Sequence, residues 1–184
     1  MAQTKDGYIL GVNPAELTRL GFQHQLWSAQ AHDLWERAGL TRGMRVLDAG
    51  CGPGFAATEL AQIVGPEGRV LAVDEAPYYV EYLRERSALL HLENLESRVG
   101  DVQNLADAGI DAGAFDFAYM RWVLCFVPDP EAVIAGIARA LRPGGAVALQ
   151  DYFNYRALTL APRSARLAKV VDALSKALAD VLAL

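Results

Sequence analysis

The sequence predicts a doubly wound α/β fold, in which a mostly parallel sheet has helices on both faces. From Met44 onward, short apolar runs alternate with longer helical segments, as in βαβ units with their right-handed crossovers. A glycine-rich loop follows the first of these runs, where open α/β sheets bind ligands. The 184 residues, 53% hydrophobic and 21% charged, fit one folded domain with a substantial core.

The first 42 residues are predicted to form a helical segment. Asn13 can cap a helix, Pro14 suits its first position, and Glu16 can close a capping box. The helix should run from Pro14 to about Gly39, with a possible break near Gly21. Its aromatic and amide side chains make no simple apolar stripe, so it suits either a lid over a pocket or an ordinary packing helix.

Residues 43–155 are predicted to form the α/β core. The expected strands are Arg45–Asp48, Arg69–Val73, Leu95–Val99, Phe115–Trp122 and Ala146–Gln150. The expected helices between them are Phe55–Val64, Pro77–Leu90 and Pro130–Leu141. The sequence Leu141-Arg142-Pro143-Gly144-Gly145 is interpreted as the turn that ends the last crossover helix before the fifth strand.

Residues 156–184 are predicted to form one amphipathic helix with no strand after it. Its apolar residues recur at intervals of three, four and seven, namely Leu167, Val170, Val171, Leu174, Leu178, Val181 and Leu182.

Composition excludes several classes of protein. No apolar run reaches the ~18 residues of a membrane span, and the first residues do not resemble a secretory signal. The net charge is −5 and the basic residues are scattered singly, so we expect no nucleic-acid partner. Cys51 and Cys125 show no metal-ligand spacing, and we expect no disulfide and a cytoplasmic location.

The strongest motif is the run Val46-Leu47-Asp48-Ala49-Gly50-Cys51-Gly52-Pro53-Gly54, a strand that ends in a glycine loop before a helix. Such a loop can hold a dinucleotide pyrophosphate, but the spacing is Gly-x-Gly-x-Gly rather than Gly-x-Gly-x-x-Gly. Asp48 also argues against a phosphate, since two like charges ~4 Å apart cost roughly 4 kcal/mol at an effective dielectric near 20. A nicotinamide-dependent oxidoreductase is therefore disfavoured. A ligand with an ammonium and a sulfonium group, S-adenosylmethionine, fits Asp48 better.

This loop resembles motif I of the class I S-adenosylmethionine-dependent methyltransferases, and the later segments follow that family in order. Val70–Asp74 resembles its second strand and Arg98–Val102 the end of its third. Phe115–Leu124 resembles the family's fourth strand and the loop after it, and Ala146–Asp151 resembles its fifth strand. The resemblance covers about Tyr8 to Tyr155 and is nearest to the quinone-biosynthesis-type small-molecule methyltransferases, which also carry an N-terminal lid helix.

The resemblance implies a set of cofactor-binding residues at successive strand ends. Asp74 would bind the ribose hydroxyls, and it lies about 20 residues beyond the glycine loop, where doubly wound nucleotide sites carry such an acid. Asp101 would face the adenine amino group. The full expected set is Asp48, Gly50, Cys51, Gly52, Asp74, Glu75, Asp101, Val102 and Arg121.

Methyl transfer by in-line displacement needs alignment more than an enzyme nucleophile, so no catalytic residue is assigned. Side chains expected near the methyl group are Tyr8, Gln23, His24, Arg121, Trp122 and Asp151. Tyr8 could close over the methionine end, His24 could be a general base or only a solvated surface histidine, and Arg121 could hold an anionic acceptor or pair with an acid. No acid cluster follows the fourth strand, so no metal is expected.

The family resemblance implies seven strands, and relative to that expectation the last two, about 60 residues or more with their connections, are missing from this sequence. A truncated chain is the preferred explanation. The alternatives are a short protein whose fifth strand and tail helix are covered by a partner or a second copy, or a protein that has lost catalysis. We expect a homodimer through the tail helix or the exposed sheet edge. The alternative function is a non-catalytic cofactor-binding module that acts through protein partners.

Overall fold

The computed structural model describes residues 13–151 together with 165–166, 169–170 and 172–173. The chain divides into two units, Met1–Gln150 and Asp151–Leu184. In the second unit the described residues between 165 and 173 are helical and exposed. Val170 is the one residue of the predicted apolar stripe among them, and the other six lie outside the described residues. Tyr8 also lies outside them.

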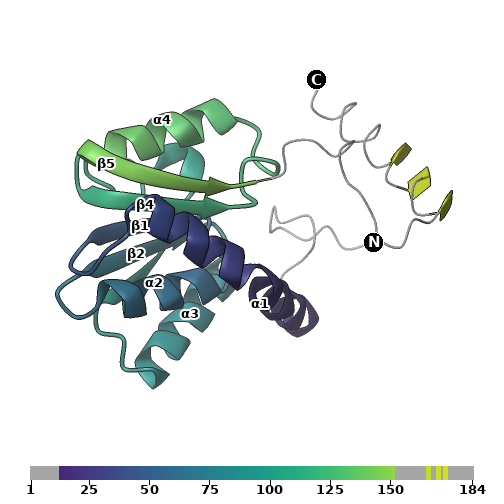
Figure 1. Cartoon of the computed structure of the whole chain (residues 1–184), viewed down its shortest axis with the longest axis horizontal. Helices are drawn as coiled ribbons and strands as arrows, with labels where there is room; N and C mark the ends of the chain where they lie inside the picture. Colours follow the sequence, from purple (N-terminus) through teal and green to yellow (C-terminus); the bar gives the residue numbers. More distant parts are fainter. Residues whose placement is uncertain (1–12, 152–164, 167–168, 171, 174–184) are drawn as a thin grey trace. The chain divides into compact units, whose positions relative to one another are not determined.

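The first unit contains a five-stranded sheet in the order β3-β2-β1-β4-β5 (Figure 1). Its strands are β1 (Arg45–Ala49), β2 (Arg69–Asp74), β3 (Leu95–Val99), β4 (Phe115–Arg121) and β5 (Leu141–Gln150). Every pair of neighbouring strands is parallel, which confirms the predicted fold class. The chain adds β2 and β3 on one side of β1 and then β4 and β5 on its other side. The topological switch point therefore lies between β1 and β4.

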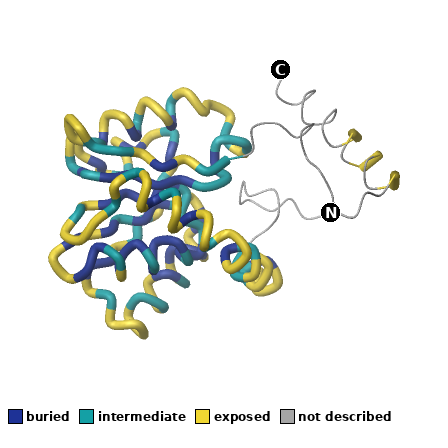
Figure 2. Tube along the Cα trace, in the orientation of Figure 1, coloured by how far each residue is buried: buried dark blue, intermediate teal, exposed yellow. Residues whose placement is uncertain are grey.

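The helices of this unit are α1 (Pro14–Arg37), α2 (Phe55–Val64), α3 (Pro77–Leu89) and α4 (Pro130–Ala140). A short 3-10 helix, η1 (Val102–Asn104), was not predicted. Two apolar clusters fill the two faces of the sheet. The first contains residues of α1, α2 and α3, and the second contains residues of η1 and α4. Figure 2 shows the buried strands between the helices, whose outer faces are exposed.

Helix α1 is continuous through Gly21, where the sequence suggested a break. A Cβ at Gly21 would lie 3.2 Å from Cζ of Phe55, so the missing side chain lets α1 approach the start of α2 closely. Asn13 caps the helix as predicted, its side-chain oxygen accepting from the Glu16 N–H at 3.0 Å. The Glu16 carboxylate pairs with Arg19 rather than closing a capping box.

Strand β5 begins at Leu141, five residues before the predicted start. Leu141 already pairs with Phe115, and Ala146 pairs with Phe117 after a shift in register. An irregularity of this kind accommodates the intervening Pro-Gly-Gly residues, with Gly144 at a φ of 81°. The predicted turn at 141–145 is therefore wrong, because these residues form the irregular first half of the strand. Among the described residues, β5 pairs with β4 alone.

Candidate active site

The carboxyl ends of β1, β2 and β4 meet at the switch point and bring together residues from three separate motifs. Asp48 precedes the last residue of β1, Asp74 ends β2 and Arg121 ends β4. In the register of β1 and β4, Asp48 lies beside Tyr119. Side chains two residues apart on a strand point to the same face. Asp48, Tyr119 and Arg121 are therefore all directed to the face of the sheet that α1 and α2 cover.

The glycine loop is fastened to the end of β2 by its own backbone. The N–H groups of Gly50 and Cys51 both donate to the Val73 carbonyl, at 2.8 and 3.0 Å. The Gly52 N–H donates to Asp74 Oδ2 at 2.7 Å. Consequently the loop after β1 and the acid at the end of β2 form one preorganised element.

The three glycines of the loop have different tasks, although all have positive φ angles of 54–75°. A Cβ at Gly50 would lie 2.3 Å from Cγ2 of Val123, and one at Gly54 would lie 2.3 Å from Cδ1 of Leu83. Next to Gly52, by contrast, no atom of the described residues lies within 4 Å of the Cβ position. The first and third glycines thus allow close packing, whereas the second faces open space that a ligand can enter.

Asp48 is 2% exposed, and its Oδ2 atom is buried without a hydrogen-bond partner among the described residues. Burial raises the pKa of its carboxyl group to about 7, the Arg121 charge opposes this rise, and the Asp74 charge adds to it. A buried acceptor without a partner is costly and calls for an explanation. A cationic donor at this position would supply the missing hydrogen bond and favour the ionised carboxylate.

Asp74 accepts hydrogen bonds from the Gly52 N–H and, at 3.0 Å, from the Ala76 N–H. Burial raises the pKa of its carboxyl group, and these two N–H groups oppose the rise. Its neighbour Glu75 is exposed. The two acids therefore differ, since Asp74 is bound into the loop and Glu75 is open to solvent.

Asp101 and Val102 follow β3 and start η1. Asp101 is exposed and accepts from the Gln103 N–H at 2.8 Å, while Val102 is 7% exposed. Gln103 in turn accepts from the Asp129 N–H at 2.9 Å, which links this segment to the start of α4. The side chains of Asp101 and Val102 thus offer one polar and one apolar surface after β3.

Arg121 lies between α1 and the end of β4. Its Nη2 atom lies 2.9 Å from His24 Nδ1, and its guanidinium carbon lies 4.9 Å from the centre of the Trp122 ring. Its Nη1 atom is buried without a hydrogen-bond partner in the described part of the chain. Trp122 itself has a φ of 55°, a left-handed conformation that is uncommon for an aromatic residue. Such outliers concentrate at functional sites.

His24 is buried at 7% exposure, which rules out the solvated surface histidine considered from the sequence. Its Nε2 atom lies 3.0 Å from Glu59 Oε1, and its ring stacks on Phe55. Because a guanidinium only donates hydrogen bonds, we assign Nδ1 as the acceptor from Arg121 and place the ring proton on Nε2, facing Glu59. Both ring nitrogens are thereby used, and the role of general base stays a prediction.

Glu59 was not anticipated from the sequence. It lies on α2 and also binds His32 of α1, with 2.8 Å between His32 Nε2 and Glu59 Oε2. The pKa of Glu59 is lowered: burial raises it, but the two histidines together lower it further. Two histidines eight residues apart on one helix were the available signal, but the sequence did not indicate their common partner.

The structure also describes further residues that the sequence singled out. Gln23 accepts from Arg19 at 3.1 Å, and Asp151 follows β5 and begins the second unit. The ring of Trp122 lies 5.8 Å from that of Trp27 in an edge-to-face arrangement. Burial raises the pKa of the Cys51 thiol well above its ordinary value, and the charges of Asp74 and Asp48 add to this effect. Cys51 is therefore a protonated lining residue of the loop, not a thiolate nucleophile.

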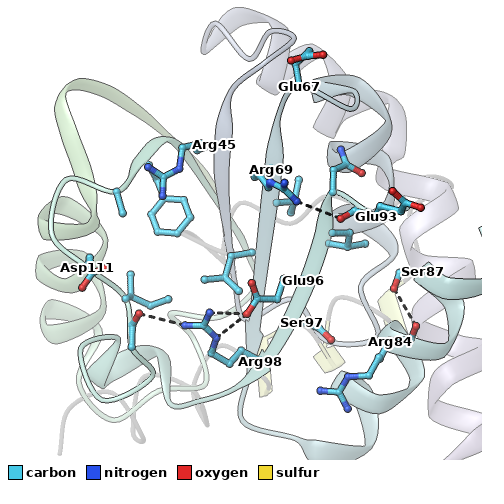
Figure 3. A pocket seen from close by; sticks show the side chains of 18 of the residues that line it. Arg45, Glu67, Arg69, Arg84, Ser87, Glu93, Glu96, Ser97, Arg98 and Asp111 are labelled. Carbon is cyan, nitrogen blue, oxygen red and sulfur yellow. Dashed lines mark hydrogen bonds and ion pairs between the residues drawn. The ribbon is translucent and has the colours of Figure 1, made fainter. Parts of the chain in front are cut away.

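A hollow of about 960 Å³ lies elsewhere, along the amino ends of β1 to β4 and the free edge of β3 (Figure 3). Its labelled side chains are mostly arginine and glutamate, several of them bound to each other or to backbone oxygens. No helix among the described residues is long and apolar enough to cross a membrane. Over the same ranges, no three His, Cys, Asp or Glu side chains cluster as metal ligands would.

Comparison with known proteins places the chain in a family. Residues 40–180 match the family model of the methyltransferase domain. The chain is 36% identical over 116 residues to an arsenite methyltransferase of Halobacterium salinarum, covering 62% of this chain and 28% of that one. It is 39% identical over 107 residues to a ubiquinone biosynthesis O-methyltransferase of Xanthomonas oryzae, covering 56% and 41%.

A crystal structure of a SAM-dependent methyltransferase from Aquifex aeolicus superposes with a TM-score of 0.70 at 22% identity, covering 90% of this chain and 88% of that one. This likeness concerns the fold. The chain spans less than half the length of both curated relatives. With the family model matched over most of its length and a glycine loop and acids at the expected strand ends, the chain belongs to the class I S-adenosylmethionine-dependent methyltransferases.

Proposed function

We propose that the chain binds S-adenosylmethionine at the carboxyl edge of the sheet and transfers its methyl group to a small-molecule acceptor. The observation that carries this proposal is the buried Asp48 Oδ2 atom, which has no partner among the described residues, beside a glycine loop that these residues leave open at Gly52. A phosphate ligand would meet the Asp48 charge unfavourably, whereas an ammonium or sulfonium group would be attracted by it. The names of the relatives, an arsenite and a ubiquinone-biosynthesis methyltransferase, support a small acceptor.

The cofactor-binding residues of this proposal follow the order of the strands. Gly50, Cys51 and Gly52 form the loop against which the cofactor lies, and Asp48 faces its cationic end. Asp74, with Glu75 beside it, binds the ribose hydroxyls. Asp101 and Val102 hold the adenine, the acid at the amino group and the apolar side chain against the ring. The residues fit the cofactor because each acceptor faces a donor or a cation.

The bound cofactor supplies an activated methyl group on sulfur. The contribution of the chain is to hold that group in line with the acceptor and to exclude water. Helix α1 is in the position to do this, since Phe22, Leu26 and Trp27 leave an apolar surface exposed on it. Exclusion of water by such a surface strengthens the electrostatic interactions inside the site.

Titration calorimetry with S-adenosylhomocysteine tests the proposal, using the wild-type chain and Asp74→Ala. Loss of a charged acceptor should weaken binding by roughly 1.5–3 kcal/mol. Asp116→Ala is the matched control, because Asp116 also accepts from a backbone N–H, that of Arg45 at 2.7 Å, but at the amino end of the sheet. The control should bind S-adenosylhomocysteine as the wild type does. No binding by a folded wild-type chain would contradict the cofactor assignment.

Formation of S-adenosylhomocysteine from S-adenosylmethionine across a panel of small acceptors then tests the transfer itself. Product formation that requires both a particular acceptor and Asp74 would support a methyltransferase. Tight binding without turnover on any acceptor would favour the alternative, a cofactor-binding module that acts through protein partners.

A further inference from the structure

The hydrogen-bond donors around Asp48 are committed to other acceptors. In the glycine loop that follows it, the N–H groups of residues 50–52 donate to the Val73 carbonyl and to Asp74. Asp74 thus receives from the loop the kind of hydrogen bond that stabilises a charged carboxylate, and Asp48 does not.

The strands on either side of Asp48 supply no donor either. In register it lies beside Ala72 of β2, whose side chain has no polar atom, and beside Tyr119 of β4. The Tyr119 hydroxyl donates to Gln150 Oε1 at 3.0 Å and is also hydrogen-bonded to Arg121. Its proton is therefore directed to β5, and burial raises its pKa, so that it is retained.

The cation that acts on Asp48 is Arg121, whose contacts are to other side chains. Its Nη2 atom lies 2.9 Å from His24 Nδ1, and its guanidinium lies over the Trp122 ring. No donor among the described residues reaches Asp48 Oδ2. The Arg121 charge lowers the pKa of Asp48, but burial raises it more strongly, and the charge of Asp74 adds to this rise.

The other titratable groups near Asp48 are each held in one state. The Cys51 thiol is kept protonated by burial and by the two aspartates. His24 has its proton on Nε2, directed to Glu59, and a second proton on Nδ1 would meet the Arg121 guanidinium. Glu59 is kept ionised by its two histidines. Asp48 is therefore the group whose charge an arriving cation can change.

On the basis of the cofactor site of the proposed function, we propose that cofactor binding is coupled to the release of one proton from Asp48. The unligated site holds a neutral carboxylic acid, because a buried carboxylate without a donor is costly. The cationic end of the cofactor supplies the missing donor, the carboxylic acid gives its proton to the solvent, and the carboxylate pairs with the cation. Acidification favours the protonated, unligated site, so pH regulates how much cofactor the chain holds.

Calorimetric titration of the wild-type chain with S-adenosylhomocysteine, in buffers of different ionisation enthalpy, measures the protons released. The wild type should release about one proton at pH 6 and a small fraction of one at pH 8. Its affinity should rise about 10-fold between these values, because a carboxyl group with a pKa of about 7 is mostly protonated at pH 6 and mostly ionised at pH 8.

Asp48→Asn removes the titrating group. It should bind more weakly than the wild type at pH 8 and release no proton from this position at pH 6. Cys51→Ala, whatever its affinity, should release as many protons as the wild type, and so should Asp116→Asn, which removes an acid of lowered pKa at the other end of the sheet. Undiminished release by Asp48→Asn would assign the proton to another group and overturn the inference.

Infrared difference spectra keep the test decisive where Asp48→Asn binds too weakly for calorimetry. A protonated carboxylic acid has a C=O stretch separate from the bands of carboxylates. Unligated wild type at pH 6 should show a contribution to this band that Asp48→Asn lacks, and S-adenosylhomocysteine should remove that contribution from the wild type.

The outcomes separate this inference from the proposed function. Binding of S-adenosylhomocysteine at pH 6 without proton release, and without loss of the carboxylic acid band, would overturn the proton coupling and leave the cofactor site intact. No binding at either pH by a chain with a cooperative thermal transition would overturn both.

Discussion

The two ends of the sheet carry charged residues in very different states. At the amino end, charged side chains line the large hollow and largely satisfy one another (Figure 3), as when Arg98 donates to Glu96 and to the Ala108 and Gly109 carbonyls. At the carboxyl end, Asp48 Oδ2 and Arg121 Nη1 are buried without partners in the described residues. Unsatisfied buried polar atoms that gather beside the glycine loop at the switch point, rather than the size of a hollow, therefore indicate where a ligand belongs.

The largest expected difference between the two ends is the loss of stability when a glycine is replaced by alanine. Gly50→Ala places a methyl group 2.3 Å from Val123 Cγ2 at a φ of 74°. Backbone strain and overpacking together should lower the free energy of unfolding by about 3–4 kcal/mol. Gly43, at the amino end, has a φ of 81° but no neighbour among the described residues within 4 Å of its Cβ position. Gly43→Ala should therefore cost only about 1 kcal/mol.

Urea unfolding of both variants checks this pair. Equal losses of stability would mean that Val123 moves aside and that the loop tolerates a side chain. In titrations with S-adenosylhomocysteine, Gly50→Ala should bind more weakly than the wild type and Gly43→Ala should not. The reason is that residue 50 belongs to the glycine loop of the proposed cofactor site.

The second difference is the pH dependence of two aspartates. The pKa of Asp48 is raised in the folded state to about 7, so the folded protein binds the extra proton and loses stability as the pH rises from about 4 to about 7. Asp48→Asn should remove this loss. At pH 8 and without ligand, the variant should exceed the wild type by roughly 2–4 kcal/mol in free energy of unfolding.

Asp116 at the amino end should behave in the opposite way. The Arg45 N–H and the Arg142 guanidinium hold the pKa of its carboxyl group below the ordinary value, against the effect of burial. Its stabilising contribution is present above pH 4 and is lost as the pH falls through the lowered pKa. Asp116→Asn should accordingly flatten the acid side of the stability profile. Urea unfolding of both variants and the wild type between pH 3 and 8 measures the free energy of unfolding as a function of pH. Parallel curves for Asp48→Asn and the wild type would contradict the raised pKa of Asp48.

The smallest effect is expected in the hollow itself. Arg98 and Glu96 form a pair 2.6 Å apart with side chains 36% and 65% exposed. Glu96→Gln should change the free energy of unfolding by less than about 0.5 kcal/mol, and the change should shrink in salt. Cofactor affinity should stay that of the wild type. A large loss of affinity would make the amino end, and not the switch point, the place to look for a ligand.

The sequence was informative where the signal is local. Helix α2 and strand β3 have the predicted bounds, because apolar periodicity with flanking glycine or proline is a property of neighbouring residues. The glycine loop was likewise recognisable, since its glycines are needed by the backbone of the loop. The predicted homodimer and the predicted absence of a metal stay predictions.

Contacts between distant residues were not predictable in this way. His24 and Arg121 are 97 positions apart, and Glu59 joins them from a third element. Nothing near His24 in the sequence indicates that its ring is buried between a carboxylate and a guanidinium. The early start of β5 was missed for a related reason, because Pro-Gly-Gly is typical of a turn and only the partner strand β4 keeps it extended.

The edge-to-face contact between Trp27 and Trp122 has a practical consequence for spectroscopy. It joins α1 to the end of β4, next to the Arg121 guanidinium. The third tryptophan of the chain, Trp35, is buried at 1% exposure against Tyr119 in the core. Trp35 lies two turns after Trp27 on the same helix, so the chain contains separate fluorescent probes of the contact between α1 and β4 and of the packing of the end of α1 on the core.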